Sequence, residues 1–131
     1  MSAEPQIAQI IVDFDGSNVA ADIITLIKLP PGAMVLPALS RCIITGDPGS
    51  VLVVHIGDVV QRQRYAVGVD CSNLGMVEFV NANIPSGVLT RVKVAESADA
   101  TQDTTLVTMQ LNTVTAHTAG RVVVMLAYAT I

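Results

Sequence analysis

Hydrophobic and polar residues alternate with a period of two along most of the chain. Such alternation is typical of β-strands, in which successive side chains point to opposite faces of a sheet. It is clear at 104–111, where Thr105, Val107, Met109 and Leu111 are predicted to face inward. The other segments with strand character are residues 7–14, 22–29, 33–44, 51–56, 67–70, 76–80, 88–95 and 121–131. A short helix is an alternative at 22–29, but the β-branched content of this segment favours a strand.

Two of these segments, 51–56 and 121–131, are apolar on both faces. A strand of this kind is expected inside a sheet or under a neighbouring layer. An aspartate in place of Val124 or Leu126 is therefore predicted to unfold the chain, because it would bury an unpaired charge.

Proline and glycine divide the strands. Pro48 lies between Gly46 and Gly49 in the segment 45–50, which predicts a chain reversal between 33–44 and 51–56. These two segments are predicted to pair in the middle of a sheet, with an edge position or a bulge at Pro37 because proline donates no ladder hydrogen bond. The polar segments 81–87, 97–103 and 112–120 are predicted to be loops.

One stretch, Gly57–Ala66, has helical character. Asp58 is placed to cap a single turn, with Arg62 on the same face four residues later. A short helix or an irregular crossover is predicted there. About eight short strands with almost no helical periodicity indicate an all-β fold of two packed antiparallel sheets, a sandwich or a jelly roll, with the strand order left open. We expect one domain, residues 10–131, preceded by an N-terminal arm, residues 1–9, that either adds a strand to a partner or is disordered.

Composition indicates that this domain has a protein partner. The chain has 131 residues, of which 51% are hydrophobic and 14% charged, so part of its apolar surface is expected to lie in an interface. A net charge of −4 with seven scattered basic residues disfavours nucleic acid as a partner. No apolar run approaches the roughly 20 residues of a membrane-spanning helix, and the N-terminus lacks the features of a secretory signal. A soluble cytosolic product without a membrane partner is expected.

No catalytic, cofactor-binding or metal-ligating residue is predicted, and the chain is not expected to be an enzyme. His55 lies in an apolar run and His117 in a predicted loop, neither at metal-ligand spacing from other candidates. Cys42 and Cys71 are expected to be buried free thiols, with a disulfide or a metal site as alternatives. The segment 13–18 is partly similar to a calcium loop, but Asn18 and Ile24 stand where such a loop has glycine and glutamate. Glycine-rich phosphate loops and nucleophile motifs are not found in the sequence.

The order of several short motifs carries a family resemblance. Leu29-Pro30-Pro31-Gly32-Ala33 is followed by Val54-His55-Ile56-Gly57-Asp58, by Arg64-Tyr65-Ala66, by a threonine-rich strand and by Gly120-Arg121-Val122-Val123-Val124 leading to Tyr128. In this order the motifs resemble the small head decoration, or cement, proteins of tailed bacteriophages over about residues 22–129. The most recognisable part of that family's pattern is matched by Gly57, Asp58, Arg64 and Tyr65, whereas the segment 33–50 is longer here.

The resemblance implies a jelly-roll β-sandwich that acts as a structural virion protein. Such a protein would bind the outside of the capsid as a dimer or trimer, and would staple neighbouring major capsid subunits after synthesis in the host cytoplasm. Its expected partners are the major capsid protein and further copies of itself, contacted by edge strands and chain ends, with no cofactor. A tail- or fibre-associated binding module and a self-assembling structural protein remain alternatives.

Overall fold

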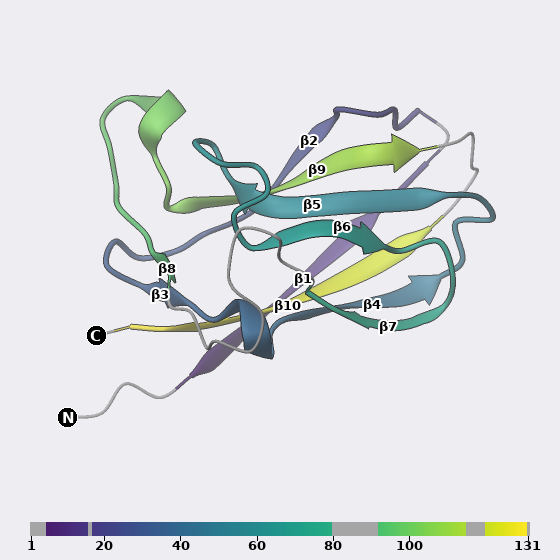
Figure 1. Ribbon diagram of the computed structural model, residues 1–131, viewed down its shortest axis with the longest axis horizontal. Coiled ribbons are helices and arrows are strands. Elements are labelled where there is room, and N and C mark those ends of the chain that lie inside the picture. The colour runs from purple at the N-terminus through teal and green to yellow at the C-terminus, as the bar shows by residue number, and fades with distance from the viewer. Residues whose placement is uncertain (1–4, 16, 80–91, 115–119, 131) are drawn as a thin grey trace.

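The computed structural model describes residues 5–15, 17–79, 92–114 and 120–130. Within these ranges, ten strands form two antiparallel sheets that face each other across one core (Figure 1). The six-stranded sheet contains β1 (Gln6–Asp13), β3 (Met34–Val35), β4 (Arg41–Gly46), β7 (Gly75–Glu78), β8 (Val92–Lys93) and β10 (Arg121–Ala129). The four-stranded sheet contains β2 (Ile23–Lys28), β5 (Leu52–Asp58), β6 (Ala66–Asp70) and β9 (Leu106–Val114). Two 3-10 turns, η1 (Pro37–Leu39) and η2 (Ala100–Gln102), complete the described elements.

Strand pairing is nested from the middle of the chain outward. Adjacent strands β5 and β6 pair first, followed by β4 with β7, β3 with β8, β2 with β9 and β1 with β10, all antiparallel. The chain is therefore one long hairpin folded over into two layers, with β10 also joined to β4 and β9 to β5. This is the wrapping of a jelly roll, and eight strands longer than two residues agree with the predicted number.

β10 is the central strand of the six-stranded sheet. One of its edges pairs with β1 along eight residues, and the other pairs with β4 and then β3. Val122, Val124 and Leu126 point into the core and are fully buried. The prediction that this doubly apolar segment lies inside a sheet is confirmed. The same holds for β5, which lies between β9 and β6.

The core lies between the two sheets and is almost entirely aliphatic. On β9, the four residues predicted to face inward, Thr105 just before the strand and Val107, Met109 and Leu111 within it, are all fully buried. Thr108 alternates with these residues and lies on the other face of β9, yet it is only 1% exposed, and Arg62 donates a hydrogen bond of 3.1 Å to its hydroxyl. The turn after β5 therefore adds a layer over this part of the four-stranded sheet.

The predicted pairing of 33–44 with 51–56 is wrong. The reversal at Pro48–Gly49 exists, but it carries the chain from β4 in one sheet to β5 in the other instead of closing a hairpin. The segment 33–44 is also not one strand: η1 begins at Pro37 and separates β3 from β4. Both differences follow from the nested pairing of the strands, since β4 pairs with β7 and β10 and β5 pairs with β6 and β9.

Other boundaries differ locally. The segment 57–66 contains no helix, because β5 continues to Asp58 and a turn then leads to β6. The strand at 22–29 is confirmed, with a register shift between Thr25 and Ile27 that the alternation did not indicate. The first half of the strand predicted at 88–95 and the loop predicted at 81–87 lie outside the described residues, and the second half contains β8. β1 includes residues 6–9 of the predicted N-terminal arm, and these pair with β10. No helix among the described residues is long and apolar enough to cross a membrane.

Candidate interaction surface

The motif formed by Gly57, Asp58, Arg64 and Tyr65 folds into a closed turn between β5 and β6. The Asp58 carboxylate is fully buried and accepts hydrogen bonds from the backbone N–H groups of Val60 and Gln61, at 3.0 and 2.9 Å. Its other oxygen is paired with the Arg64 guanidinium at 2.5 Å. Asp58 therefore caps the turn as predicted, but its charged partner is Arg64, whereas Arg62 bonds to Thr108.

The two other residues of this motif also serve the turn. A side chain at position 57 would clash with the carbonyl groups of Gln61 and Arg62, so glycine is required there. Tyr65 is fully buried, and its backbone N–H donates to the Ile56 carbonyl at 2.9 Å. Burial, and then the neighbouring Asp58 carboxylate, raise the pKa of the Tyr65 phenol well above its ordinary value. The motif is thus a structural clamp, in which every charge is already paired within the turn.

The sulfur and imidazole side chains are also part of the fold. Cys42 and Cys71 are free and fully buried. The adjoining Cys71 thiol and burial raise the pKa of the Cys42 thiol well above its ordinary value, so it is protonated at neutral pH. His55 on β5 is 6% exposed, and its Nδ1 accepts a hydrogen bond of 3.0 Å from the Gly68 N–H. His117 lies outside the described residues. No group of three potential metal ligands occurs within the described residues.

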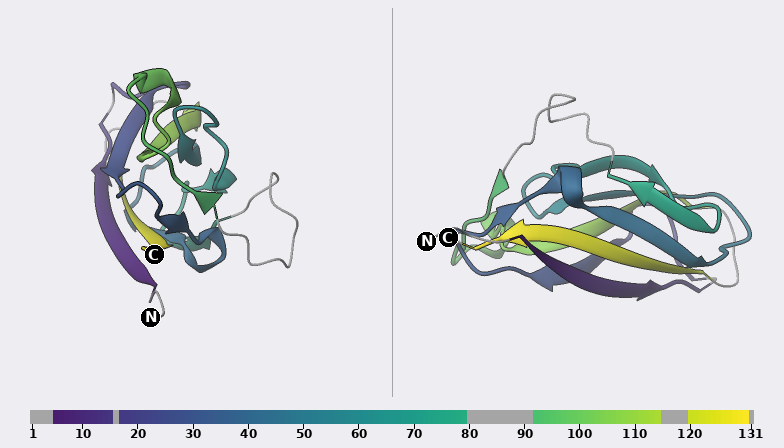
Figure 2. Two further views of the ribbon diagram at one scale, coloured as in Figure 1. Left: turned by 90° about the vertical axis from the view of Figure 1, so that its left-hand side faces the viewer. Right: turned by 90° about the horizontal axis from the view of Figure 1, so that it is seen from below.

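Exposed apolar side chains gather on the outer face of the six-stranded sheet. On β1 the even positions Ala8, Ile10 and Val12 pack toward the core, while Ile7 and Ile11 point outward and are 52% and 55% exposed. This face is seen in Figure 2, right, where β1, β10 and β4 lie side by side. The alternation of the sequence thus places isoleucines on both faces of β1.

Four of these outward residues form one row across the sheet. Ile11 pairs with Val123, Val123 with Ile43, and Ile43 with Met76, so the row crosses β1, β10, β4 and β7 in register. We call these four residues the apolar ladder. Met76, at its far end, is 54% exposed, and Val123, in the middle, is 8% exposed. Directly opposed apolar residues of this kind stabilise a sheet. Their row forms an apolar strip whose exposed area is largest at its two ends, Ile11 and Met76.

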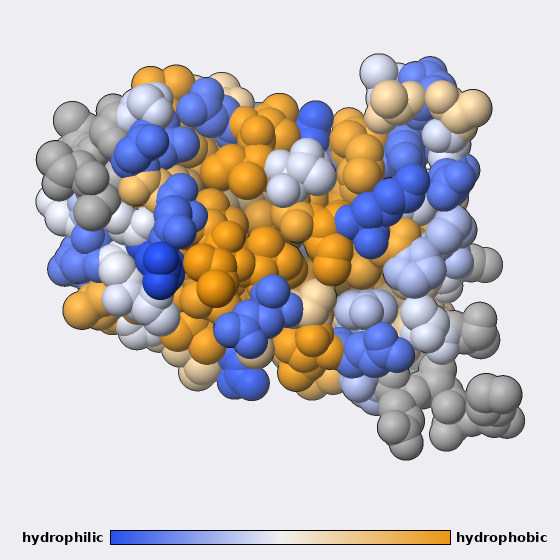
Figure 3. Space-filling model, turned by 180° about the vertical axis from the view of Figure 1, so that it is seen from behind, coloured by the Kyte–Doolittle hydropathy of each residue, from blue (hydrophilic) through white to orange (hydrophobic). Residues whose placement is uncertain are grey.

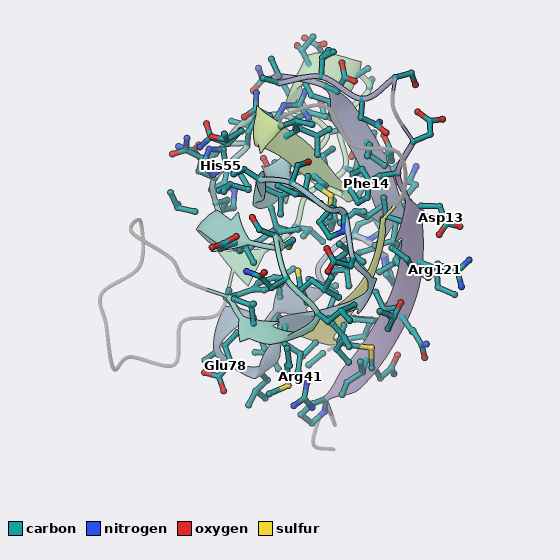
Figure 4. All side chains as sticks on the ribbon, turned by 90° about the vertical axis from the view of Figure 1, so that its right-hand side faces the viewer. Asp13, Phe14, Arg41, His55, Glu78 and Arg121 are labelled. Carbon is teal, nitrogen blue, oxygen red and sulfur yellow. The ribbon has the colours of Figure 1, made fainter. Side chains whose placement is uncertain are left out.

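Charged residues border the ladder on both sides. On one side Arg121 holds Asp13 through bonds of 2.6 and 3.3 Å, and this guanidinium keeps the pKa of the Asp13 carboxyl below its usual range. On the other side Arg41 pairs in register with Glu78, and its guanidinium lies 3.5 Å from the Met76 sulfur. Figure 4 shows both pairs on the outside of this sheet, with His55 on the opposite layer. An apolar centre between polar borders is typical of a protein contact surface.

A second apolar area lies where β1 and β2 run along the same side of the sandwich (Figure 2, left). Ile10, Ile24, Leu26 and Ile27 pack against the core there but remain partly exposed, and Ile23 is 47% exposed. Figure 3 shows hydrophobic side chains across the middle of this side of the molecule. β1 therefore borders two apolar surfaces, the outer face and this open side.

These surfaces suit contact with another protein and offer no reactive group. The sequence led us to expect contacts at edge strands, but it did not single out Ile7, Ile11, Ile43 or Met76. For β1 a signal existed, since isoleucine occurs at both odd and even positions of residues 7–12. For Ile43 and Met76 there was none, because their common row depends on which strands pair.

No family model matches the sequence, and no curated protein matches it. Among solved structures, one chain from the Cyanophage Pam1 capsid asymmetric unit is similar with a TM-score of 0.69 and 18% identity, covering 98% of this chain and 86% of that chain. A chain from the acidic stable capsid structure of Helicobacter pylori bacteriophage KHP30 is similar with a TM-score of 0.54 and 14% identity, covering 97% of this chain and 93% of that chain. At these identities the likeness is one of fold. The protein therefore has the fold of chains that occur in two phage capsid structures.

Proposed function

We propose that the protein is a structural virion protein of a tailed bacteriophage, which binds the outer surface of the capsid and staples neighbouring major capsid subunits. The observation that carries this proposal is the likeness in fold, over at least 97% of the chain, to chains from two phage capsid structures. The order of short motifs from Leu29 to Tyr128 resembles that of phage decoration proteins and supports the same role.

The apolar ladder supplies a contact surface of the right chemistry. Ile11 and Met76 expose more than half of their surface, and on one border of the strip between them Asp13 and Arg121 form an ion pair. A capsid subunit packed on this strip would remove it from water, which favours association by roughly 25 cal/mol for each Å² of apolar area buried. Each contact is then modest in free energy, and its effect grows through repetition over the capsid lattice.

Stapling follows from holding two subunits at once. One copy, or an oligomer of copies, would contact two adjacent capsid subunits. Once the first contact has formed, the second forms at high effective concentration, so the two capsid subunits separate slowly. The partners in this proposal are the major capsid protein and further copies of the chain as a dimer or trimer. The protein acts on the exterior of the capsid after synthesis in the host cytoplasm, and it acts by binding alone, without a cofactor and without catalysing a reaction.

Cosedimentation with phage heads tests the proposal. The purified protein is mixed with mature, expanded heads and with unexpanded procapsids of the phage that encodes it, and bound protein is measured in the pellet. We expect binding to expanded heads and poor binding to procapsids. Equal binding to both particles, or to neither, would contradict the proposal.

A pair of variants tests the contact surface. Met76→Glu places a charge at the exposed end of the ladder and is expected to weaken binding to expanded heads on the order of tenfold. Val60→Glu makes the same kind of change at a residue that is 48% exposed in the β5–β6 turn, away from the ladder, and should bind as wild type. If both variants lost binding to the same extent, the apolar ladder would not be the contact surface.

A further inference from the structure

We propose that β1 pairs edge to edge, antiparallel, with β1 of a second copy of the chain. The two six-stranded sheets would then join into one continuous sheet across a two-fold axis. This inference rests on β1 itself and does not depend on the proposed function. It makes the free protein a dimer whether or not a capsid is present.

β1 lacks the protection that the other edge strands carry. Edge strands usually avoid further pairing by being short, by carrying charge or proline, or by bulging. β7 has four residues and contains Glu78, and β8 has two residues and contains Lys93. β2 contains Lys28 and a register shift, and β6 contains Asp70 and pairs with β5 across a register shift between Val54 and Ile56. β1, in contrast, pairs with β10 over eight residues without a shift. Its one charged residue, Asp13, stands at its last position and is paired with Arg121 of β10, and Gln6–Val12 has neither charge nor proline.

The open edge of β1 presents a regular set of backbone groups. The Phe14 N–H donates to the Gly120 carbonyl at 2.8 Å, so even-numbered residues direct their backbone groups toward β10. Successive residues of a strand direct these groups to opposite sides. The N–H and C=O groups of Ile7, Gln9, Ile11 and Asp13 therefore point away from β10, toward an edge with which no described strand pairs.

One two-fold register matches these groups and their side chains. With Gln9 opposite Gln9 of the second copy, Ile7 lies opposite Ile11 of the second copy, and Ala8 opposite Ile10. Odd residues then meet odd residues, so the outward backbone groups bond to each other. The two neighbouring two-fold registers place Ile7 opposite Asp13 or opposite Gln9, which pairs an apolar residue with a polar one. An axis at Ile7 or at Ile11 also satisfies the backbone, but it pairs fewer residues of β1 than the axis at Gln9. In the register with Gln9 at the axis, each residue from Ile7 to Ile11 lies opposite one of its own kind, polar opposite polar and apolar opposite apolar. An uncharged segment that matches itself in this way fits a second copy of the chain.

This pairing would also extend the apolar ladder. Ile11, 55% exposed in the single chain, would gain Ile7 of the second copy as its cross-strand neighbour on the outer face. The closed two-fold symmetry is the commonest form of a homo-oligomer and ends growth at two copies. The apolar strip of one sheet would thus run into that of the other.

The mass of the protein in solution is the first test. Light scattering or sedimentation is expected to give twice the 13.7 kDa of one chain. Gln9→Lys puts like charges opposite each other at the two-fold axis and should raise the dissociation constant about tenfold or more. Gln102→Lys makes the same change at an exposed residue of η2 and should leave the mass unchanged. A monomeric or trimeric wild type, or a Gln9→Lys variant that stays as dimeric as Gln102→Lys, would overturn the inference.

A cysteine pair tests the register. In Gln9→Cys the two Cα atoms at the axis would be about 5.5 Å apart, within the range that a disulfide spans, so oxidised glutathione should link the copies covalently. In Ile11→Cys the two cysteines would be displaced by four residues, and no link should form. The natural cysteines are buried and do not compete. If Ile11→Cys links as well as Gln9→Cys, or Gln9→Cys does not link, the register is wrong.

Discussion

Asp58 joins three donors from one turn to a single buried carboxylate. The Val60 and Gln61 N–H groups and the Arg64 guanidinium all depend on it, and the side chain is fully buried. Removing the carboxylate leaves these donors without their acceptor, which is costly in a buried site. Asp58→Ala is therefore expected to lower the free energy of unfolding by about 3 kcal/mol in urea denaturation.

The neighbouring Arg62 provides the control for Asp58. Arg62→Ala loses one hydrogen bond to the Thr108 hydroxyl and should cost about 1 kcal/mol. Equal losses in the two variants would mean that the carboxylate does not organise the turn.

Tyr65 is a buried polar side chain whose hydroxyl has no hydrogen-bond partner among the described residues. A buried hydroxyl without a partner has lost its hydrogen bonds to water and gained none in the protein, so its burial lowers the stability of the fold. Tyr65→Phe is expected to leave the free energy of unfolding at pH 7 unchanged or to raise it by up to about 1 kcal/mol. A clear loss of stability in urea denaturation would show that the hydroxyl has a partner in solution.

The same side chain should make the protein sensitive to base. Burial raises the pKa of Tyr65 in the folded state, whereas in the unfolded chain the phenol ionises near its ordinary value of 10.0. Above that pH the unfolded state releases the proton first, so the free energy of unfolding falls as pH rises from 10 toward about 12. In Tyr65→Phe the free energy of unfolding, measured by urea denaturation at each pH, should fall less steeply over this range. An unchanged dependence on pH would mean that Tyr65 is not the group responsible.

At the scale of elements, β10 is the strand on which the six-stranded sheet depends. Val124 is fully buried between the layers, so Val124→Asp, like Leu126→Asp, would bury a charge without a partner and should cost several kcal/mol, about 3–5, enough to unfold the chain. Met125→Asp, on the same strand, places the charge on the partly exposed outer face near Arg41 and should be tolerated far better. Circular dichroism melting distinguishes the two. If the Val124→Asp variant melted at the same temperature as the wild type, β10 would not lie in the interior of the sandwich.

A strand could be predicted from the sequence where its own pattern of apolar residues shows which of its faces are buried. Thr105, Val107, Met109 and Leu111 alternate because one face of β9 meets the core, and the doubly apolar β10 indicated a central strand. Pairing between distant strands could not be read, because nothing local tells β4 that its neighbours are β10 and β7 instead of β5. The apolar ladder was missed for the same reason, since Ile43 and Met76 become one row only through that pairing. Asp58 was correctly seen as a cap, but its choice of Arg64 over Arg62 depends on the path of the turn.

At the scale of the whole molecule, the contact surface is apolar in the centre, and at one of its borders Asp13 and Arg121 already form an ion pair. Binding to expanded heads is therefore expected to persist when salt is raised from about 0.1 M to about 1 M, because apolar contacts are not screened. A contact carried by exposed charges would be released over that range. Cosedimentation at the two salt concentrations measures the difference, and loss of the protein from the pellet at high salt would contradict an apolar contact.

The nested pairing has a consequence for synthesis. β10 fills the middle of the six-stranded sheet, yet it is the final strand of the ten to be translated. While the ribosome still holds this segment, β1 has no neighbour and β4 lacks one side. The layer is therefore completed only after β10 has emerged from the ribosome, and until then the apolar N-terminal strands of the nascent chain are open to aggregation.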